Sequence, residues 1–334
     1  MTIFLSPTHI TSLHESGAVT MADYVAAVEA AYRDQGLGDF QILPRQNFWV
    51  ERPGQAKPAS LKLGGGLLRN VGAMGCSMYS TGYGGGMNLW ITVYSAVHGG
   101  VEAILHGGGI GPMKTGATAA VAAKYMARSD ARTAAIIGTG DQARTQLLGL
   151  MEVRPLTALR VHSRDEDNRT AYAAWARGRF PQLAVQPTAS AQAAVEDADI
   201  VVTVTNSKSP VIEASWISRG AHCAFIGAHY PDRREVDAAT LKRGRIVVDD
   251  LDQAFHEKGE ILIPLESGEF TRDLILGDLG SVITGKLKPR QSPDDITMFL
   301  SGGTSLEYLG ASAMLARKAK AAGLGQVLDG GDDD

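Results

Sequence analysis

A glycine-rich turn in the middle of the chain has the spacing of a dinucleotide-binding fingerprint, G-x-G-x-x-G/A. The residues of this turn are Gly138, Thr139, Gly140, Asp141, Gln142 and Ala143. An apolar run at 134–137 precedes the turn, an amphipathic segment follows it to about Val153, and a second apolar run begins at Leu159. This order predicts strand, turn, helix and strand, with a pyrophosphate at the helix N-terminus, where free backbone N–H groups attract an anion. The alternative is a glycine turn that serves only the backbone conformation.

The residues after the second predicted strand bear on which dinucleotide binds. Folds of this type that bind NAD usually place Asp or Glu here to hold the ribose 2′-hydroxyl, whereas NADP sites accommodate a phosphate with Arg. Ser163 and Arg164 therefore favour NADP(H) as the cofactor. NAD(H) stays an alternative, because Asp165 and Glu166 follow directly.

Several strands predicted after the fingerprint end in polar or flexible residues. The carboxyl ends of the strands line the ligand crevice of a doubly wound sheet, so these residues are candidates for cofactor binding. They are Thr205, Asn206, Ser207, Gly227, Ser301 and Gly302. His229 follows an apolar run at 221–226 and is a candidate acid or base, because an imidazole changes charge near neutral pH. The alternative is a histidine whose hydrogen bonds are satisfied and which takes no part in catalysis.

Two basic residues are candidates for holding a substrate carboxylate. Arg45 follows Pro44 at the start of a β-rich run, and the fork of a guanidinium matches the two oxygens of a carboxylate. Lys114 opens an alanine-rich segment that predicts a helix to about Ala127. An ammonium in the first turn of a helix is unfavourable unless an anion lies nearby. Either side chain could instead point into water, as most basic side chains do.

Composition describes a globular protein of two domains. The chain has 334 residues, of which 44% are hydrophobic and 20% charged, and a formal net charge of −4. This charge argues against nucleic acid or an anionic membrane as a partner. No membrane-spanning run or signal peptide is predicted. Two distant cysteines, Cys76 and Cys223, favour a cytoplasmic location, and no His/Cys spacing indicates a metal site.

The order of apolar runs predicts an α/β fold with a Rossmann-type doubly wound sheet and a β-rich domain for substrate binding and dimerisation. The predicted Rossmann domain covers 115–304, and the β-rich domain covers 1–114 with 305–330. Glycines such as those at 64–66 are expected to separate the strands of an antiparallel sheet. The strands expected in it lie at 46–50, 60–63, 73–80, 89–95 and 101–105. One helix is expected over 6–36 and a final helix over 306–322.

Four segments together resemble the ornithine cyclodeaminase/μ-crystallin family. They are Lys114-Thr115-Gly116-Ala117, the fingerprint from Gly138 to Arg144, Gly227-Ala228-His229-Tyr230-Pro231-Asp232-Arg233-Arg234-Glu235-Val236-Asp237, and Ile296-Thr297-Met298-Phe299-Leu300-Ser301-Gly302-Gly303. The segments occur in the order found in the family, and the resemblance covers about 40–315. It implies an NAD(P)-binding Rossmann domain, a homodimer, and hydride transfer at the α-carbon of an amino or imino acid.

The resemblance also assigns individual residues. Arg45 matches the family arginine that holds the substrate carboxylate, and Lys114-Thr115 match an Arg-Thr pair whose threonine lies near the cofactor phosphates. Lysine at 114 keeps the positive charge but loses the bidentate fork. A family lysine falls on Ser77, for which nearby Lys62 could supply a replacement ammonium.

A further departure bears on the reaction. The family aspartate that assists deamination falls on His229. Losing this aspartate together with the lysine argues against ornithine cyclisation. The sequence therefore predicts an NAD(P)H-dependent oxidoreductase that reduces an imine or dehydrogenates an amino acid. The alternatives are a cyclodeaminase-type lyase and a non-catalytic ligand-binding protein like μ-crystallin.

Overall fold

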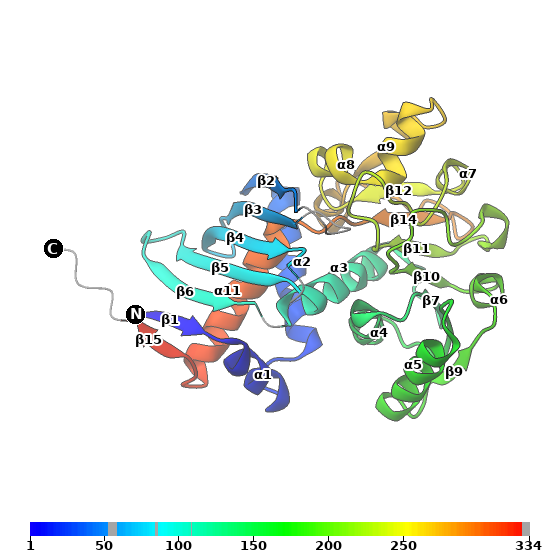
Figure 1. Cartoon of the computed structure of the whole chain (residues 1–334). Helices are drawn as coiled ribbons and strands as arrows, with labels where there is room; N and C mark the ends of the chain where they lie inside the picture. The colour runs from blue at the N-terminus through cyan, green and yellow to red at the C-terminus, as the bar shows by residue number, and fades with distance from the viewer. Residues whose placement is uncertain (53–58, 84–85, 108, 329–334) are drawn as a thin grey trace. The chain divides into compact units, whose positions relative to one another are not determined.

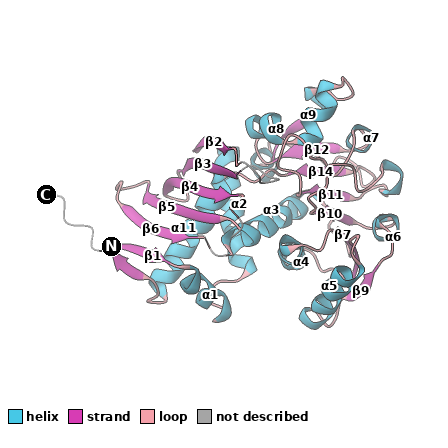
Figure 2. Cartoon of the chain, viewed as in Figure 1, coloured by secondary structure: helices cyan, strands magenta, loops and turns pink. Residues whose placement is uncertain are grey.

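The computed structural model describes residues 1–52, 59–83, 86–107 and 109–328. The chain forms two compact units, which we call the N-terminal unit (1–114 with 304–334) and the central unit (115–303). Each unit contains one β-sheet (Figure 2). Helix α3 (Ile110–Met126) runs across the boundary between Lys114 and Thr115.

The sheet of the N-terminal unit has seven strands in the order β15-β1-β6-β5-β4-β3-β2. They are β1 (Thr2–Leu5), β2 (Phe40–Val50), β3 (Ala59–Leu68), β4 (Ala73–Thr81), β5 (Asn88–Ser95), β6 (Val101–His106) and β15 (Gln326–Leu328). The five predicted strands, β2 to β6, pair antiparallel as expected. The sheet as a whole is mixed, because β1 pairs with β6 in parallel. Strands β1 and β15 escaped prediction because runs of four and three residues are too short to show a period of two.

Three helices accompany this sheet: α1 (Pro7–Glu15), α2 (Met21–Leu37) and α11 (Ser305–Ala321). The single helix expected over 6–36 is two helices, because Gly17 adopts φ +74° and ends the first one. Helix α11 packs against α2 and against strands β3, β4 and β5, so the C-terminal helix returns to the N-terminal unit (Figure 1).

The glycines at 64–66 lie inside β3 and do not end it, contrary to the prediction. They give the sheet a flat surface for the start of α11. A Cβ at Gly64 would overlap the hydroxyl of Ser305, and a Cβ at Gly66 would lie 3.0 Å from the Leu306 side chain. Glycine in a strand marks the close approach of another element, and here that element is α11.

The central unit has an eight-stranded sheet in which every pair of neighbours is parallel, in the order β13-β12-β14-β11-β10-β7-β8-β9. The strands are β7 (Thr133–Ile137), β8 (Ala158–His162), β9 (Ala184–Pro187), β10 (Ile200–Thr203), β11 (His222–Phe225), β12 (Arg245–Val248), β13 (Ile275–Asp278) and β14 (Thr297–Leu300). The chain moves outward from β7 through β8 to β9 and then returns to pair β10 with β7. This reversal is the switch point of a doubly wound fold, and the predicted fold class is confirmed.

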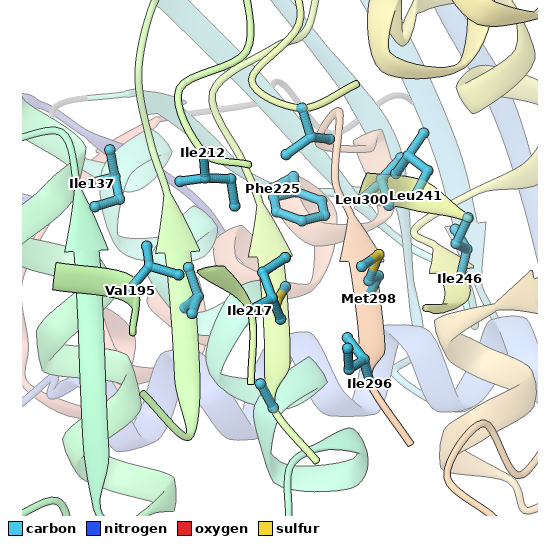
Figure 3. Packing of buried hydrophobic residues seen from close by; sticks show 14 of the residues in the cluster. Ile137, Val195, Ile212, Ile217, Phe225, Leu241, Ile246, Ile296, Met298 and Leu300 are labelled. Carbon is cyan, nitrogen blue, oxygen red and sulfur yellow. The ribbon is translucent and has the colours of Figure 1, made fainter. Parts of the chain in front are cut away.

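Helices cover this sheet and bury its apolar residues. They are α4 (Asp141–Val153), α5 (Glu166–Arg179), α6 (Ala191–Val195), α7 (Ala238–Leu241), α8 (Leu251–Glu257), α9 (Gly259–Glu266) and α10 (Leu279–Ile283), with 3₁₀ turns at Ala214–Trp216 and Arg272–Leu274. Figure 3 shows Ile137 of β7, Phe225 of β11 and Met298 of β14 in one core. Helices α3 and α4 approach closely because Gly149 leaves room for the backbone of Gly116.

Among the described residues, no helix is long and apolar enough to cross a membrane. In the same part of the chain, no group of three or more His, Cys, Asp or Glu side chains is placed to hold a metal ion.

Candidate functional site

A cavity of about 630 Å³ lies at the carboxyl ends of the strands in the central unit, on both sides of the switch point. Its lining includes eight of the predicted cofactor residues: Gly138, Thr139, Gly140, Ser163, Arg164, Thr205, Asn206 and Ser207. Ligands of doubly wound sheets bind in this crevice. The structure therefore brings the fingerprint turn and two later segments of the chain to one cavity.

The fingerprint turn has the backbone that a pyrophosphate site requires. Gly138 follows β7 with φ +105°, and a Cβ there would lie 2.6 Å from the carbonyl oxygen of Val204. Gly140 is exposed, with no atom within 4 Å of its would-be Cβ, and it immediately precedes α4. Asp141 and Gln142 form the first turn of α4 and are exposed, whereas Ala143 is buried. Open space in front of a helix N-terminus suits a dinucleotide phosphate.

The Gly140→Ala substitution should separate ligand binding from folding. The free energy of unfolding should stay within about 1 kcal/mol of the wild-type value, because the added methyl group meets no atom of the protein. The Kd for the dinucleotide should rise on the order of 10- to 100-fold, since the methyl group would occupy space that the phosphate needs. Fluorescence titration with NAD(P)H and urea unfolding measure the two effects.

Gly178→Ala in α5 is the matched control, because Gly178 also has nothing within 4 Å and does not line the cavity. Unchanged dinucleotide affinity in Gly140→Ala would show that the ligand does not approach this backbone.

The two acidic residues that follow Arg164 after β8 have their partners in α5. Asp165 accepts a hydrogen bond from the backbone of Asn168 at 2.8 Å and caps α5. Glu166 pairs with Arg169 at 3.2 Å. Arg164 is exposed beside the cavity, and in the described part of the chain no hydrogen bond or ion pair holds its side chain. Ser163 donates its hydroxyl hydrogen to the carbonyl of Asp165.

The end of β10 is held by a buried carboxylate that the sequence did not single out. Glu235 is fully buried and accepts hydrogen bonds from the Thr203 hydroxyl at 2.8 Å and from the backbone N–H groups of Thr205 and Gly227. Burial raises the pKa of this carboxyl, although the hydrogen bonds oppose the shift. A Cβ at Gly227 would overlap the Thr205 backbone, so packing against β10 explains this glycine.

The end of β14 is held in the same manner. Asp249 is buried, and its Oδ2 accepts hydrogen bonds from the Ser301 hydroxyl and from the N–H groups of Gly302 and Gly303. Ser301 and Gly302 thus lie in a rigid turn beyond the carboxyl end of β14. They do not line the cavity that contains the fingerprint.

His229 lies on the segment after β11 and is half-buried. Its Nδ1 lies 3.1 Å from the carbonyl oxygen of Gly227, and its ring centre lies 4.5 Å from that of Tyr230. Because a carbonyl oxygen only accepts, Nδ1 carries the hydrogen and Nε2 is the acceptor of the neutral ring. An imidazole with an orienting partner on one nitrogen can exchange a proton through the other.

In the N-terminal unit, Arg45 and Lys62 both contact the side chain of Tyr79. Arg45 donates from Nη1 to the hydroxyl of Tyr79 at 3.1 Å, and the Lys62 ammonium lies 5.9 Å from the centre of the same ring. The pairing of β2 with β3 shifts register between Leu43 and Gln46. Arg45 therefore lies at a β-bulge of an edge strand, where proline is tolerated and a side chain can be redirected. The strand begins at Phe40, six residues before its predicted start.

Lys114 lies in the second turn of α3, because this helix begins at Ile110 and not at Lys114 as predicted. Its ammonium forms an ion pair with Glu307, which also accepts a hydrogen bond from the Tyr32 hydroxyl. Burial alone would lower the pKa of Lys114, but the Glu307 carboxylate outweighs burial and raises it. Lys114 is therefore a permanent cation, and its charge is explained by Glu307 and not by the helix dipole.

Two neighbouring tyrosine rings lie among these basic residues. The Lys114 ammonium lies 4.6 Å from the ring centre of Tyr308, and the ring centres of Tyr308 and Tyr79 are 6.5 Å apart. Burial raises the pKa of Tyr308 to about 12, so its hydroxyl is neutral at physiological pH. Arg45, Lys62 and Lys114 thus surround one pair of tyrosines, and we call this group the cationic cluster.

The remaining predicted residues lie close to these groups. Ser77 is buried on β4, two residues from Tyr79 on the same face of the sheet. Thr115 is the first residue of the central unit, and its place near the cofactor phosphates stays a prediction. The sequence analysis did not identify Glu307. The one sign of it in the sequence is an acidic residue in the first turn of a helix that is otherwise rich in alanine and leucine.

The chain resembles known proteins over almost its whole length. The sequence model of the Ornithine cyclodeaminase/mu-crystallin family matches residues 9–323. A Delta(1)-pyrroline-2-carboxylate reductase of Bacillus cereus is 31% identical over 228 residues, which are 68% of this chain and 70% of the relative.

Two solved structures have the same fold. The first is the Thermococcus litoralis Delta(1)-pyrroline-2-carboxylate reductase in complex with NADH and L-proline. It superimposes with a TM-score of 0.89 at 27% identity, over 98% of this chain and 100% of the other. An archaeal alanine dehydrogenase dimer with bound NAD gives a TM-score of 0.88 at 26% identity, over 99% of each chain.

Proposed function

Because the chain belongs to the ornithine cyclodeaminase/mu-crystallin family, we propose that it is an NAD(P)H-dependent oxidoreductase acting on the C–N bond of an α-imino or α-amino acid. The observation that carries this proposal is the cationic cluster. Arg45 offers a guanidinium fork and Lys114 a permanent ammonium, and both are suited to a carboxylate. The reductase of Thermococcus litoralis, which has this fold, was solved with an amino acid and NADH.

The chemistry divides between the two units. A bound reduced nicotinamide supplies the hydride for the imine carbon. The central unit would hold this cofactor at the fingerprint turn, and the cationic cluster of the N-terminal unit would hold the carboxylate. His229 would hold the proton that the imine nitrogen requires, since its Nδ1 is fixed by Gly227 and its Nε2 can exchange a proton.

A substrate panel tests the proposal. The purified chain is mixed with NADPH or NADH and with cyclic imino acids, or with 2-oxo acids plus amines, and the absorbance of the reduced nucleotide is followed. Net oxidation of the nucleotide is the expected result. Ammonia release from ornithine or lysine without net change in the nucleotide would indicate a lyase instead. Nucleotide binding without turnover on either panel would indicate a ligand-binding protein.

We also propose NADP(H) as the preferred cofactor. The acidic side chains of Asp165 and Glu166 are engaged by α5, whereas Arg164 stands exposed beside the cavity. Arg164→Ala should raise the Kd for NADPH by about 10- to 100-fold, because a charge-assisted contact to the 2′-phosphate contributes about 1.5–3 kcal/mol. The Kd for NADH should change less than about threefold. Equal effects on the two nucleotides would assign the site to NAD(H).

The partner of the N-terminal unit is proposed to be a second copy of the chain. One face of its sheet packs against α11, and the other carries large apolar side chains that are each 36–56% exposed: Phe48, Leu61, Met78, Trp90 and Tyr94. The pairing of β2 to β5 places these five side chains on one face. An exposed apolar surface of this kind is typical of a protein–protein interface. Sedimentation velocity should give a dimer, and a monomer at micromolar concentration would contradict this proposal.

A further inference from the structure

Lys258 is one of the largest fully buried side chains of the chain, at 1% exposure. It immediately precedes α9 in the central unit. Taking an ammonium out of water is unfavourable unless hydrogen bonds and an opposite charge replace the solvent. An apolar side chain of similar volume would avoid this cost. The position therefore needs an explanation beyond filling the core.

The Lys258 ammonium uses its hydrogens to join two loops. It donates to the carbonyl of Ala228 at 2.7 Å, to that of Ser301 at 2.9 Å and, more weakly, to that of Phe225 at 3.5 Å. Its fourth neighbour is a carboxylate oxygen of Glu260 at 3.6 Å. Phe225 and Ala228 belong to the end of β11 and the segment after it, and Ser301 follows β14. One buried cation thus fixes the spacing of two loops at the carboxyl edge of the sheet.

Glu260 links Lys258 to a third strand, β10, through Glu235. Glu260 accepts a hydrogen bond from the N–H of Glu235 at 3.2 Å, and the Glu235 carboxylate binds the end of β10 through Thr203 and Thr205. Burial raises the pKa of Glu260 to about 7, while the nearby ammonium opposes this shift. Strands β10, β11 and β14 belong to the half of the sheet on the far side of the switch point from β8 and β9. In a doubly wound fold, the two halves each take one mononucleotide of the cofactor.

We propose that Lys258 is a positioning residue for the nicotinamide half of the dinucleotide site, acting through the backbone that carries His229 and through the turn at Ser301. This inference rests on the proposed function. Lys258 does not itself touch the cofactor. Its ammonium donates hydrogen bonds to the carbonyls of both Ala228 and Ser301. These bonds fix the distance between the segment that carries His229 and the turn that contains Gly302. The adenosine half would bind at Gly138 to Arg164, on β7 and β8, and should not depend on these contacts.

The test compares the whole cofactor with a fragment that lacks nicotinamide. Lys258→Met keeps an unbranched side chain, one atom shorter, and removes the charge. Its Kd for NADPH should rise at least about 10-fold and its kcat should fall on the order of 100-fold, as for a misplacement of about 1 Å. The Kd for 2′-phospho-ADP-ribose should stay within about twofold of the wild-type value. Lys242→Met, at an exposed lysine of the same unit, is the control and should match the wild type.

A general loosening of the central unit would weaken NADPH and the fragment equally, and that result would overturn the proposal. Unchanged binding of both ligands with unchanged kcat would overturn it as well. If Lys258→Met does not fold, Glu260→Gln is measured instead, because it removes only the ionic partner of the ammonium. It should weaken NADPH but not the fragment, and equal or absent effects would again overturn the proposal. Wild-type protein that binds neither ligand would overturn the proposed function and this inference with it.

Discussion

Replacing Arg45 by alanine should lower kcat/KM for the imino or amino acid by about 100- to 1000-fold and leave dinucleotide affinity unchanged. Truncating one partner of a hydrogen-bonded charge pair costs about 2–5 kcal/mol, since the other charge is left without its partner. Arg45 is half-buried and anchored by Tyr79, so its guanidinium is oriented before any ligand arrives. Steady-state kinetics and fluorescence titration with NADPH measure the two quantities.

Two further variants make this prediction specific to the guanidinium. Arg45→Lys keeps the charge without the fork and should recover only part of the lost activity. Arg69→Ala removes an exposed arginine of the same unit, whose ion pair with Asp39 lies at the surface, and should have little effect. A change of less than about threefold in Arg45→Ala would show that the carboxylate is held elsewhere.

The central unit could be predicted from sequence because its signals are local. Ile200–Thr203 and Arg245–Val248 are apolar runs rich in β-branched residues, and turn residues bound them, so local sequence alone indicates strands there. The fingerprint turn likewise carries its conformation in its own glycines, as φ +105° at Gly138 illustrates. Short parallel strands that are buried on both faces need no long-range information to be recognised.

The N-terminal unit was harder because contacts distant in sequence decide its structure. The glycines at 64–66 resemble a loop until α11, about 240 residues later, is seen to pack on them. Pro44 resembles a strand boundary until the bulge of an edge strand accommodates it. Lys114 appeared to oppose a helix dipole, and only the pairing with Glu307, 193 residues away, accounts for its charge.

The buried charges of the central unit were missed for the same reason. Glu and Lys side chains are usually exposed, and nothing near Glu235 or Lys258 in the sequence distinguishes them from exposed residues. Their hydrogen-bond partners are backbone groups and the Thr203 hydroxyl at the ends of three strands, which adopt their positions only when the sheet is complete. Sequence patterns thus identified groups that would contact ligands and missed those that hold these groups in place.

Replacing His229 by alanine should lower kcat by about 100- to 10,000-fold, the usual contribution of a positioned acid or base, without changing the Kd for NADPH. The physical reason is that the hydrogen bond to Gly227 orients the ring, whose Nε2 would exchange a proton with the substrate nitrogen. Initial rates at saturating nucleotide and fluorescence titration with NADPH provide the measurements.

The control is His256→Ala, because His256 is an exposed histidine of the same unit whose one hydrogen bond among the described residues is to the backbone of its own helix. A structural role for His229 predicts a different pattern. Loss of its hydrogen bond to Gly227 would then disturb the turn beside Thr205, so dinucleotide affinity would fall and kcat at saturation would stay near the wild-type value. The ratio of the change in kcat to the change in Kd therefore separates a proton donor from a residue that only supports the cofactor site.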